Sequence, residues 1–117
     1  MAYGDHTTES GEAATRELLG RRPDLDAIFA ASDPMALAAL RTLRTLGRRV
    51  PEDVAVVGFD DTPSSQDSDP ALTTVHQPIE EMGRTMAELL AARIDGVEGS
   101  EHAAVILPTQ LVVRASS

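Results

Sequence analysis

Residues 53–61 read DVAVVGFDD, and this stretch decides the fold. Positions 54–59 form a mostly apolar run whose length is typical of a strand that is buried on both faces of a sheet. Two adjacent acids, Asp60 and Asp61, follow the run directly. The stretch therefore predicts a core strand that ends at the surface in a pair of carboxylates.

Strand-like and helix-like segments alternate along the rest of the chain. The clearest helix follows Ser32, with Asp33 expected at the N-cap, Pro34 at the first helical position and Gly47 beyond the last turn. This alternation predicts an α/β fold of three-layer, Rossmann-like type, with a mostly parallel sheet flanked by helices and an antiparallel edge from the last strands. The other expected segments are helices at 8–19 and 78–96, strands at 26–32, 53–59 and 73–77, one or two strands within 103–114, a strand end at 1–3 and a loop at 97–102.

The composition limits what the chain can bind. Ten basic and nineteen acidic residues give a net charge of -9, which disfavours nucleic acid and anionic membranes as direct partners of these 117 residues. There is no cysteine, so disulfides and thiolate metal sites are excluded. No apolar run approaches the roughly 20 residues that span a bilayer, and the N-terminus has no signal-peptide pattern. A cytoplasmic domain is the expectation.

Polar side chains follow each predicted strand end. His6 follows the first, Ser32 the second, Asp60 the third, and Gln77 closes the fourth. The carboxyl ends of parallel strands meet at one edge of a sheet, where ligands of such folds bind. Hydroxyl, carboxylate, imidazole and amide groups suit a ligand with several hydroxyls or ring nitrogens, such as a sugar or a nucleoside.

Other interpretations of the same residues stay open. Asp33 fits an ordinary helix cap, and Asp60 and Asp61 fit turn formers. Paired acids at a strand end are also compatible with a Mg²⁺ or phosphoaspartate site, but no lysine or third acid is placed to support one. His76 and His102 are interpreted as surface histidines. The chain shows no phosphate-binding loop, no nucleophile elbow and no metal-spaced histidine cluster, so the sequence predicts no catalytic residue, metal or cofactor.

Three stretches resemble the C-terminal part of LacI/GalR-family transcriptional regulators. They are YGDHTTESG (3–11), LPTQLVVRASS (107–117) and the long segment DAIFAASDPMALAALRTLRTLGRRVPEDVAVVGFDDTPSSQDSDPALTTVHQPIEEMGRTMAELL (26–90). The resemblance implies a lobe of a type I periplasmic-binding-protein-like effector domain. In the family a sugar or purine binds between two lobes and changes operator affinity allosterically, usually in a homodimer. The headpiece that binds DNA and most of the first lobe are not in this chain, so DNA binding is expected only through the parent protein.

The resemblance also assigns residues. His6, Ser32, Asp60 and Gln77 match effector-contacting positions, with Asp60 matching the carboxylate that grips the ligand, whereas Asp61 is expected to be structural.

The family's dimer surface maps to Met35, Leu37, Ala38, Thr62 and Leu72. The alternative is that these residues only cover their own sheet.

The helix at 78–97 packs on the other lobe in the family. Exposing its six large apolar side chains would cost on the order of 10 kcal/mol. Without that lobe, we expect it to fold back on its own sheet or to dock on a second chain, including by exchange between protomers.

Two rival functions remain from the sequence. A periplasmic-type sugar-binding protein has the same fold, and an exported leader upstream would indicate it. A small hydrolase or phosphatase using Asp60 and Asp61 would require Mg²⁺.

Overall fold

The structure, a computed structural model, describes residues 1–96 and 104–117. The loop predicted at 97–102, with His102, lies outside the described residues. No described helix is long and apolar enough to cross a membrane. The elements in chain order are α1 (Thr8–Arg21), β1 (Ala27–Phe29), α2 (Asp33–Thr45), β2 (Ala55–Asp60), α3 (Pro63–Gln66), β3 (Thr73–His76), α4 (Ile79–Ile94) and β4 (Gln110–Val112).

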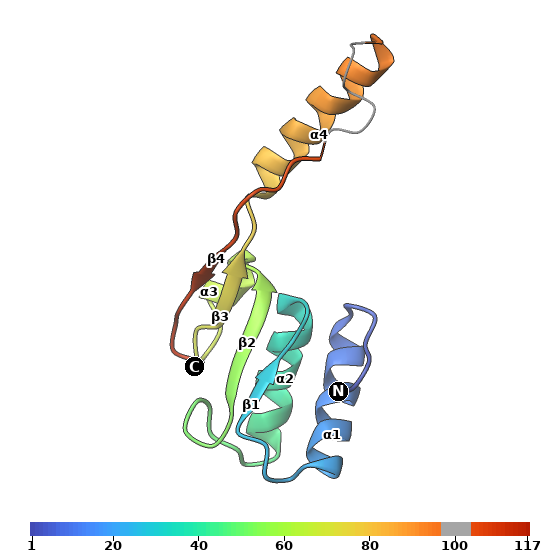
Figure 1. Ribbon diagram of the computed structural model, residues 1–117. Coiled ribbons are helices and arrows are strands. Elements are labelled where there is room, and N and C mark those ends of the chain that lie inside the picture. Colours follow the sequence, from blue (N-terminus) through green and yellow to red (C-terminus); the bar gives the residue numbers. More distant parts are fainter. Residues whose placement is uncertain (97–103) are drawn as a thin grey trace. The chain divides into compact units, whose positions relative to one another are not determined.

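The sheet has four strands in the order β1-β2-β3-β4 (Figure 1). β1, β2 and β3 run parallel, and β4 pairs antiparallel with β3. The predicted α/β class, with a mostly parallel sheet and an antiparallel edge, is confirmed. The predicted strand end at 1–3 is wrong. This segment is held by α1 instead of pairing with β1, because the carbonyl of Met1 accepts a hydrogen bond from Arg21 near the end of that helix.

The core lies between α2 and one face of the sheet. Leu43 of α2, Val56 of β2 and Leu72 are fully buried, and all three belong to the same apolar core cluster. α1 lies beside α2 (Figure 1). A Cβ at Gly11 would come within 2.7 Å of the Cα of Met35, so the two helices can approach this closely only at a glycine.

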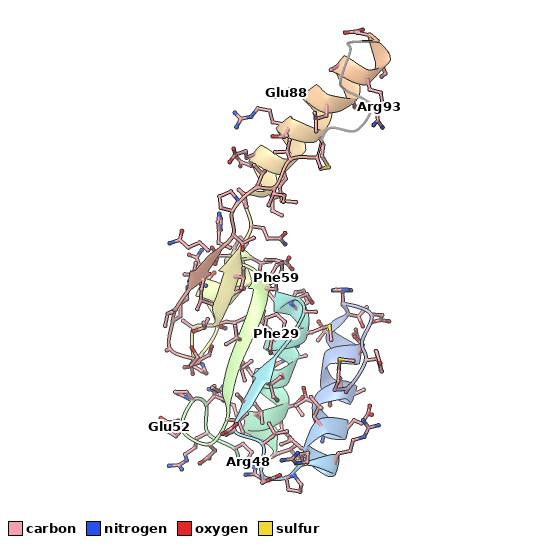
Figure 2. The ribbon with its side chains drawn as sticks, in the orientation of Figure 1. Phe29, Arg48, Glu52, Phe59, Glu88 and Arg93 are labelled. Atoms are coloured by element: carbon pink, nitrogen blue, oxygen red, sulfur yellow. The ribbon has the colours of Figure 1, made fainter. Side chains whose placement is uncertain are left out.

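The other face of the sheet carries aromatic side chains. Because side chains alternate along a strand and Val56 faces α2, Phe29 and Phe59 belong to the opposite face. Figure 2 shows both rings near the carboxyl ends of their strands. Phe29 is 65% exposed. α2 therefore covers the opposite face of this sheet, and α1 packs against α2.

The end of the chain closes the sheet between two strands. The hydroxyl of Ser116 donates to the carbonyl of Val56 at 2.6 Å and accepts the amide of Thr73 at 2.8 Å. Its own carbonyl accepts the amide of Val56 at 2.8 Å. Ser116 is fully buried, so its backbone and side chain together join the beginnings of β2 and β3.

The chain divides into two compact units. The first consists of Met1–His76 and Gln110–Ser117, and the second of Gln77–Thr109. Within the second, α4 has no buried residue. One side of α4 and the returning segment line a hollow of about 260 Å³. Met86, Leu90 and Ile94 are each more than half exposed, so this helix has an apolar face of the kind for which the sequence predicts a partner.

Candidate functional site

Three strand ends meet at one edge of the first unit. β1, β2 and β3 are parallel, so their carboxyl ends lie on the same side. β2 ends at Asp60 and β3 at His76, and these two residues are Cα partners in the sheet. The chain leaving β1 reaches Ser32 within three residues. The predicted polar edge is thus built from three strand ends, because the expected strand at 1–3 is absent.

Ser32, and not Asp33, is the N-cap of α2. Ser32 has extended backbone angles, and Asp33 is the first helical residue, so the expected cap is displaced by one position. The carboxylate of Asp33 is bound to residues outside its helix, which is why it does not cap. Ser32 is only 4% exposed, and its Oγ has no hydrogen-bond partner among the residues that the structure describes. Buried hydroxyls normally have a hydrogen-bond partner, so this one is a feature that needs an explanation.

Asp33 is fully buried and accepts three hydrogen bonds. The amide and the hydroxyl of Thr62 donate to Oδ2 at 2.7 and 3.0 Å. The hydroxyl of Thr74 donates to Oδ1 at 2.6 Å. A buried carboxylate is tolerated when its oxygens are satisfied in this way. Asp33 therefore ties the first turn of α2 to the segment after β2 and to β3.

Asp60 and Asp61 form a left-handed bend at the end of β2. Their φ angles are 114° and 55°. Residues with a side chain rarely adopt such angles, and each costs on the order of 1–3 kcal/mol unless the surroundings hold it. The sequence indicated a turn here, but its left-handed backbone was not expected.

Asp61 forms an ion pair with Arg114 and a side-chain contact with His76. Arg114 donates to Oδ1 at 2.7 Å, and the Nδ1 of His76 lies 3.0 Å from Oδ2. The Arg114 guanidinium, opposed by partial burial and aided by His76, holds the pKa of Asp61 below its ordinary value. Both oxygens of Asp61 are occupied by its own chain. Among the residues that the structure describes, no group of three acids or histidines could hold a metal ion.

The sequence reasoning did not predict that His76 and Arg114 bind Asp61. His76 was interpreted as a surface histidine, and its side chain is 49% exposed, but it is bonded to Asp61. The alignment of two adjacent strand ends was the available signal for His76. No signal indicated Arg114, which is 53 residues from its partner.

The other two predicted effector residues are His6 and Gln77. His6 has a φ of 67° and lies just before α1, where it lines a mostly apolar hollow of about 320 Å³ with Ala31. The residues that line this hollow do not include Ser32 or Asp60. Gln77 is the first residue of the second unit. Ser32 directly precedes Asp33, and Asp60 directly precedes Asp61, so each adjoins a residue of the hydrogen-bonded network, while His6 lines a separate hollow.

The residues assigned to a dimer surface differ in their exposure. Leu72 and Ala38 are buried within the chain itself, at 0% and 2% exposed. Met35 packs toward α1, and Thr62 is bonded in the cluster just described. Leu37 is partly exposed and lines a groove of about 230 Å³ along α2. Leu37 is thus a partly exposed apolar member of this set that borders a groove along α2.

Comparison with known proteins supports one family. The model of the periplasmic binding protein-like domain matches residues 1–117. The HTH-type transcriptional regulator CelR of Thermobifida fusca is 59% identical over 116 residues, which is 99% of this chain and 34% of that protein. The regulator MalR of Streptomyces coelicolor is 46% identical over 112 residues, which is 96% of this chain and 32% of that protein. The chain spans about a third of the length of these relatives.

Solved structures agree in fold and sequence. A complex of the transcriptional regulator CelR with cellobiose matches 98% of this chain and 35% of its own, with a TM-score of 0.94 and 59% identity. A LacI family transcriptional regulator from an Arthrobacter species, in complex with lactose, matches 97% of this chain and 43% of its own, with a TM-score of 0.83 and 36% identity. The resemblance to LacI/GalR-family regulators is confirmed by these relatives.

Proposed function

The chain belongs to the periplasmic binding protein-like domain family, and from this premise we propose that it is the effector-binding and oligomerisation lobe of a LacI/GalR-type transcription regulator. We propose cellobiose, or a disaccharide close to it, as the effector. One observation carries this proposal: the chain is 59% identical over nearly its whole length to a regulator that was solved with cellobiose. In the whole regulator, effector binding would change operator affinity, and DNA would be bound by a separate headpiece.

In this proposal, the polar edge of the first unit binds the sugar. The Asp60 carboxylate accepts hydrogen bonds from neighbouring sugar hydroxyls, and each such bond contributes about 1.5–3 kcal/mol. The Ser32 hydroxyl, which is buried and lacks a partner among the described residues, binds a further hydroxyl. His6 and Gln77 stay predicted contacts of the sugar.

Calorimetric titration of the full-length regulator tests this function. We expect cellobiose to bind more tightly than lactose or maltose, and to alter binding to an operator fragment. Asp60→Asn should weaken cellobiose binding by about 10- to 100-fold, since one charged acceptor is lost. Glu52→Gln is the matched control, because Glu52 is an exposed acid in the loop before β2. Unchanged affinity in Asp60→Asn would remove this residue from the site, and binding of none of the three sugars would refute the ligand class.

Homodimerisation is a second part of the proposal. The groove along α2 combines the apolar side chain of Leu37 with Arg41, Arg44 and Asp69. Apolar surface bordered by charges of both signs fits a self-complementary interface. Light scattering on a sizing column should give a dimer for the native protein and a monomer for Leu37→Asp. A dimer of unchanged stability in this variant would place the interface elsewhere.

A further inference from the structure

We propose that Asp33 is a positioning residue for effector recognition, which holds the bend at the end of β2 in the conformation that presents Asp60. The proposal rests on the function proposed above, in which Ser32 and Asp60 contact the effector. Asp33 itself is fully buried and has no surface to offer a ligand. Its effect would be exerted through the residues that it binds.

The first step is the direct anchoring of the segment after Asp60. Oδ2 of Asp33 accepts both the amide of Thr62 at 2.7 Å and its hydroxyl at 3.0 Å. Two hydrogen bonds from one residue fix both its position and its orientation. Thr62 follows Asp60 by two positions, so the far side of the bend is held by a buried, charged acceptor.

The second step is a relay through Thr74. Its hydroxyl donates to Oδ1 of Asp33 at 2.6 Å and accepts the amide of Asp61 at 3.3 Å. The two amides that follow Asp60 are therefore both bound within this network, one directly and one through a hydroxyl. This hydroxyl cannot be lost without leaving the Asp61 amide and one carboxylate oxygen short of a partner.

The strand residues before the bend are in direct contact with the Asp33 carboxylate. A Cβ at Gly58 would lie 2.4 Å from Oδ1 of Asp33, so the carboxylate rests directly on the backbone of β2 two residues before Asp60. Asp60 is thus enclosed between two segments that touch the same carboxylate. The φ of 114° at Asp60 is a conformation that persists only where the surroundings impose it.

The same residue also fixes the other predicted contact. Ser32 directly precedes Asp33 and caps α2, with its Oγ buried and without a partner among the described residues. Because Asp33 joins the start of α2 to the bend, it sets the spacing between the Ser32 hydroxyl and the Asp60 carboxylate. A fixed spacing of this kind selects ligands whose hydroxyls match it.

Hydrogen exchange measured by mass spectrometry tests the anchoring without any ligand. Thr74→Val removes the relay hydroxyl, and Thr42→Val is the matched control. Thr42 is also buried, and its hydroxyl donates to a carbonyl inside α2 at 2.9 Å. We expect faster exchange of the segment 59–66 in Thr74→Val, and not in Thr42→Val. Equal exchange of this segment in both variants would overturn the proposal.

Cellobiose titrations of the full-length protein then separate positioning from a general loss of stability. We expect Thr74→Val to weaken cellobiose binding about tenfold, and to have less than a twofold effect when Asp60→Asn is already present. Thr42→Val should leave affinity unchanged. Equal weakening by Thr74→Val in both backgrounds would show a role unrelated to Asp60 and would overturn the proposal.

A second variant covers the case in which Thr74→Val does not fold. Thr62→Val removes one of the two Thr62 donors and keeps the amide, and the same two measurements are expected to change in the same direction. If the native protein binds no cellobiose, the proposed ligand is wrong, and the exchange of 59–66 alone decides whether Asp33 holds the bend. A failure of the ligand and a failure of the positioning role are therefore distinguished.

Discussion

Replacing Gly58 by alanine probes the contact between β2 and the buried carboxylate of Asp33. The added Cβ would lie 2.4 Å from Oδ1 of Asp33, 3.0 Å from Cδ2 of Leu72 and 3.1 Å from Cβ of Ala36. None of these neighbours can withdraw easily. Leu72 and Ala36 are fully buried in the core, and Asp33 is held by three hydrogen bonds.

The expected cost has two parts. Overpacking of a well-packed core typically costs about 1–3 kcal/mol. Displacing Asp33 weakens hydrogen bonds to a buried charge, which adds about 1–3 kcal/mol. We therefore expect Gly58→Ala to lower the free energy of unfolding by about 2–6 kcal/mol. For a chain of this size this corresponds to a fall in Tm of roughly 8–24 °C.

Thermal and urea unfolding followed by circular dichroism measure this change. Gly20→Ala is the matched control, because Gly20 lies in α1 with nothing within 4 Å of its added Cβ. Alanine is favoured over glycine in a helix, so this variant should gain about 0.5–1 kcal/mol. A Tm for Gly58→Ala at or above that of the native protein would refute the close contact between Asp33 and the strand.

Three further changes are expected to alter stability. Leu43 is fully buried, so Leu43→Ala should lower the free energy of unfolding by about 2–5 kcal/mol. Leu46 is 45% exposed, so Leu46→Ala should lower it much less. Similar losses for the two variants in urea unfolding would contradict the assigned core. Arg114 keeps the folded-state pKa of Asp61 below its unfolded value, so the pair stabilises the fold above about pH 4, and this contribution disappears as the pH falls through the folded-state pKa. In unfolding experiments from pH 7 to 2, the free energy of unfolding of Asp61→Asn should therefore fall less steeply with pH than that of the native protein. The same steepness in both proteins would argue against the pair. Ser116→Ala removes the hydroxyl that joins the beginnings of β2 and β3 and should cost about 1–3 kcal/mol in thermal unfolding, so an unchanged Tm would mean that this hydroxyl is dispensable.

The local pattern of apolar and polar residues was sufficient to predict most of the helices and strands. The apolar run at 54–59 predicted a strand that corresponds to β2 at Ala55–Asp60, and the apolar stripe after Ser32 predicted a helix that corresponds to α2. These predictions succeeded because each depends on residues that are neighbours in the sequence. The strand end expected at 1–3 failed because strand formation depends on a partner edge, and here the backbone of Met1 is bonded to Arg21 instead.

The candidate site was harder to predict, because its bonds join residues that are distant in the sequence. Asp33 was expected to cap a helix, which is the local choice for an acid before a proline. In the structure its carboxylate binds Thr62 and Thr74, 29 and 41 residues away, and the cap moves to Ser32. The choice between these two roles depends on strand register and on the bend after β2, neither of which is encoded by spacing alone.

The arrangement of acids at the end of β2 also bears on the kind of effector that fits. Asp33 and Asp61 belong to one hydrogen-bonded network, in which Arg114 binds Asp61, and Asp60 directly precedes Asp61. Asp33 and Asp61 are occupied by donors from their own chain, so they stabilise the edge but leave it negatively charged. A phosphorylated or carboxylated ligand would be repelled by this excess of negative charge, whereas a neutral sugar supplies hydroxyl donors that carboxylates accept. The acids at this edge thus fit the proposed neutral sugar better than an anionic ligand.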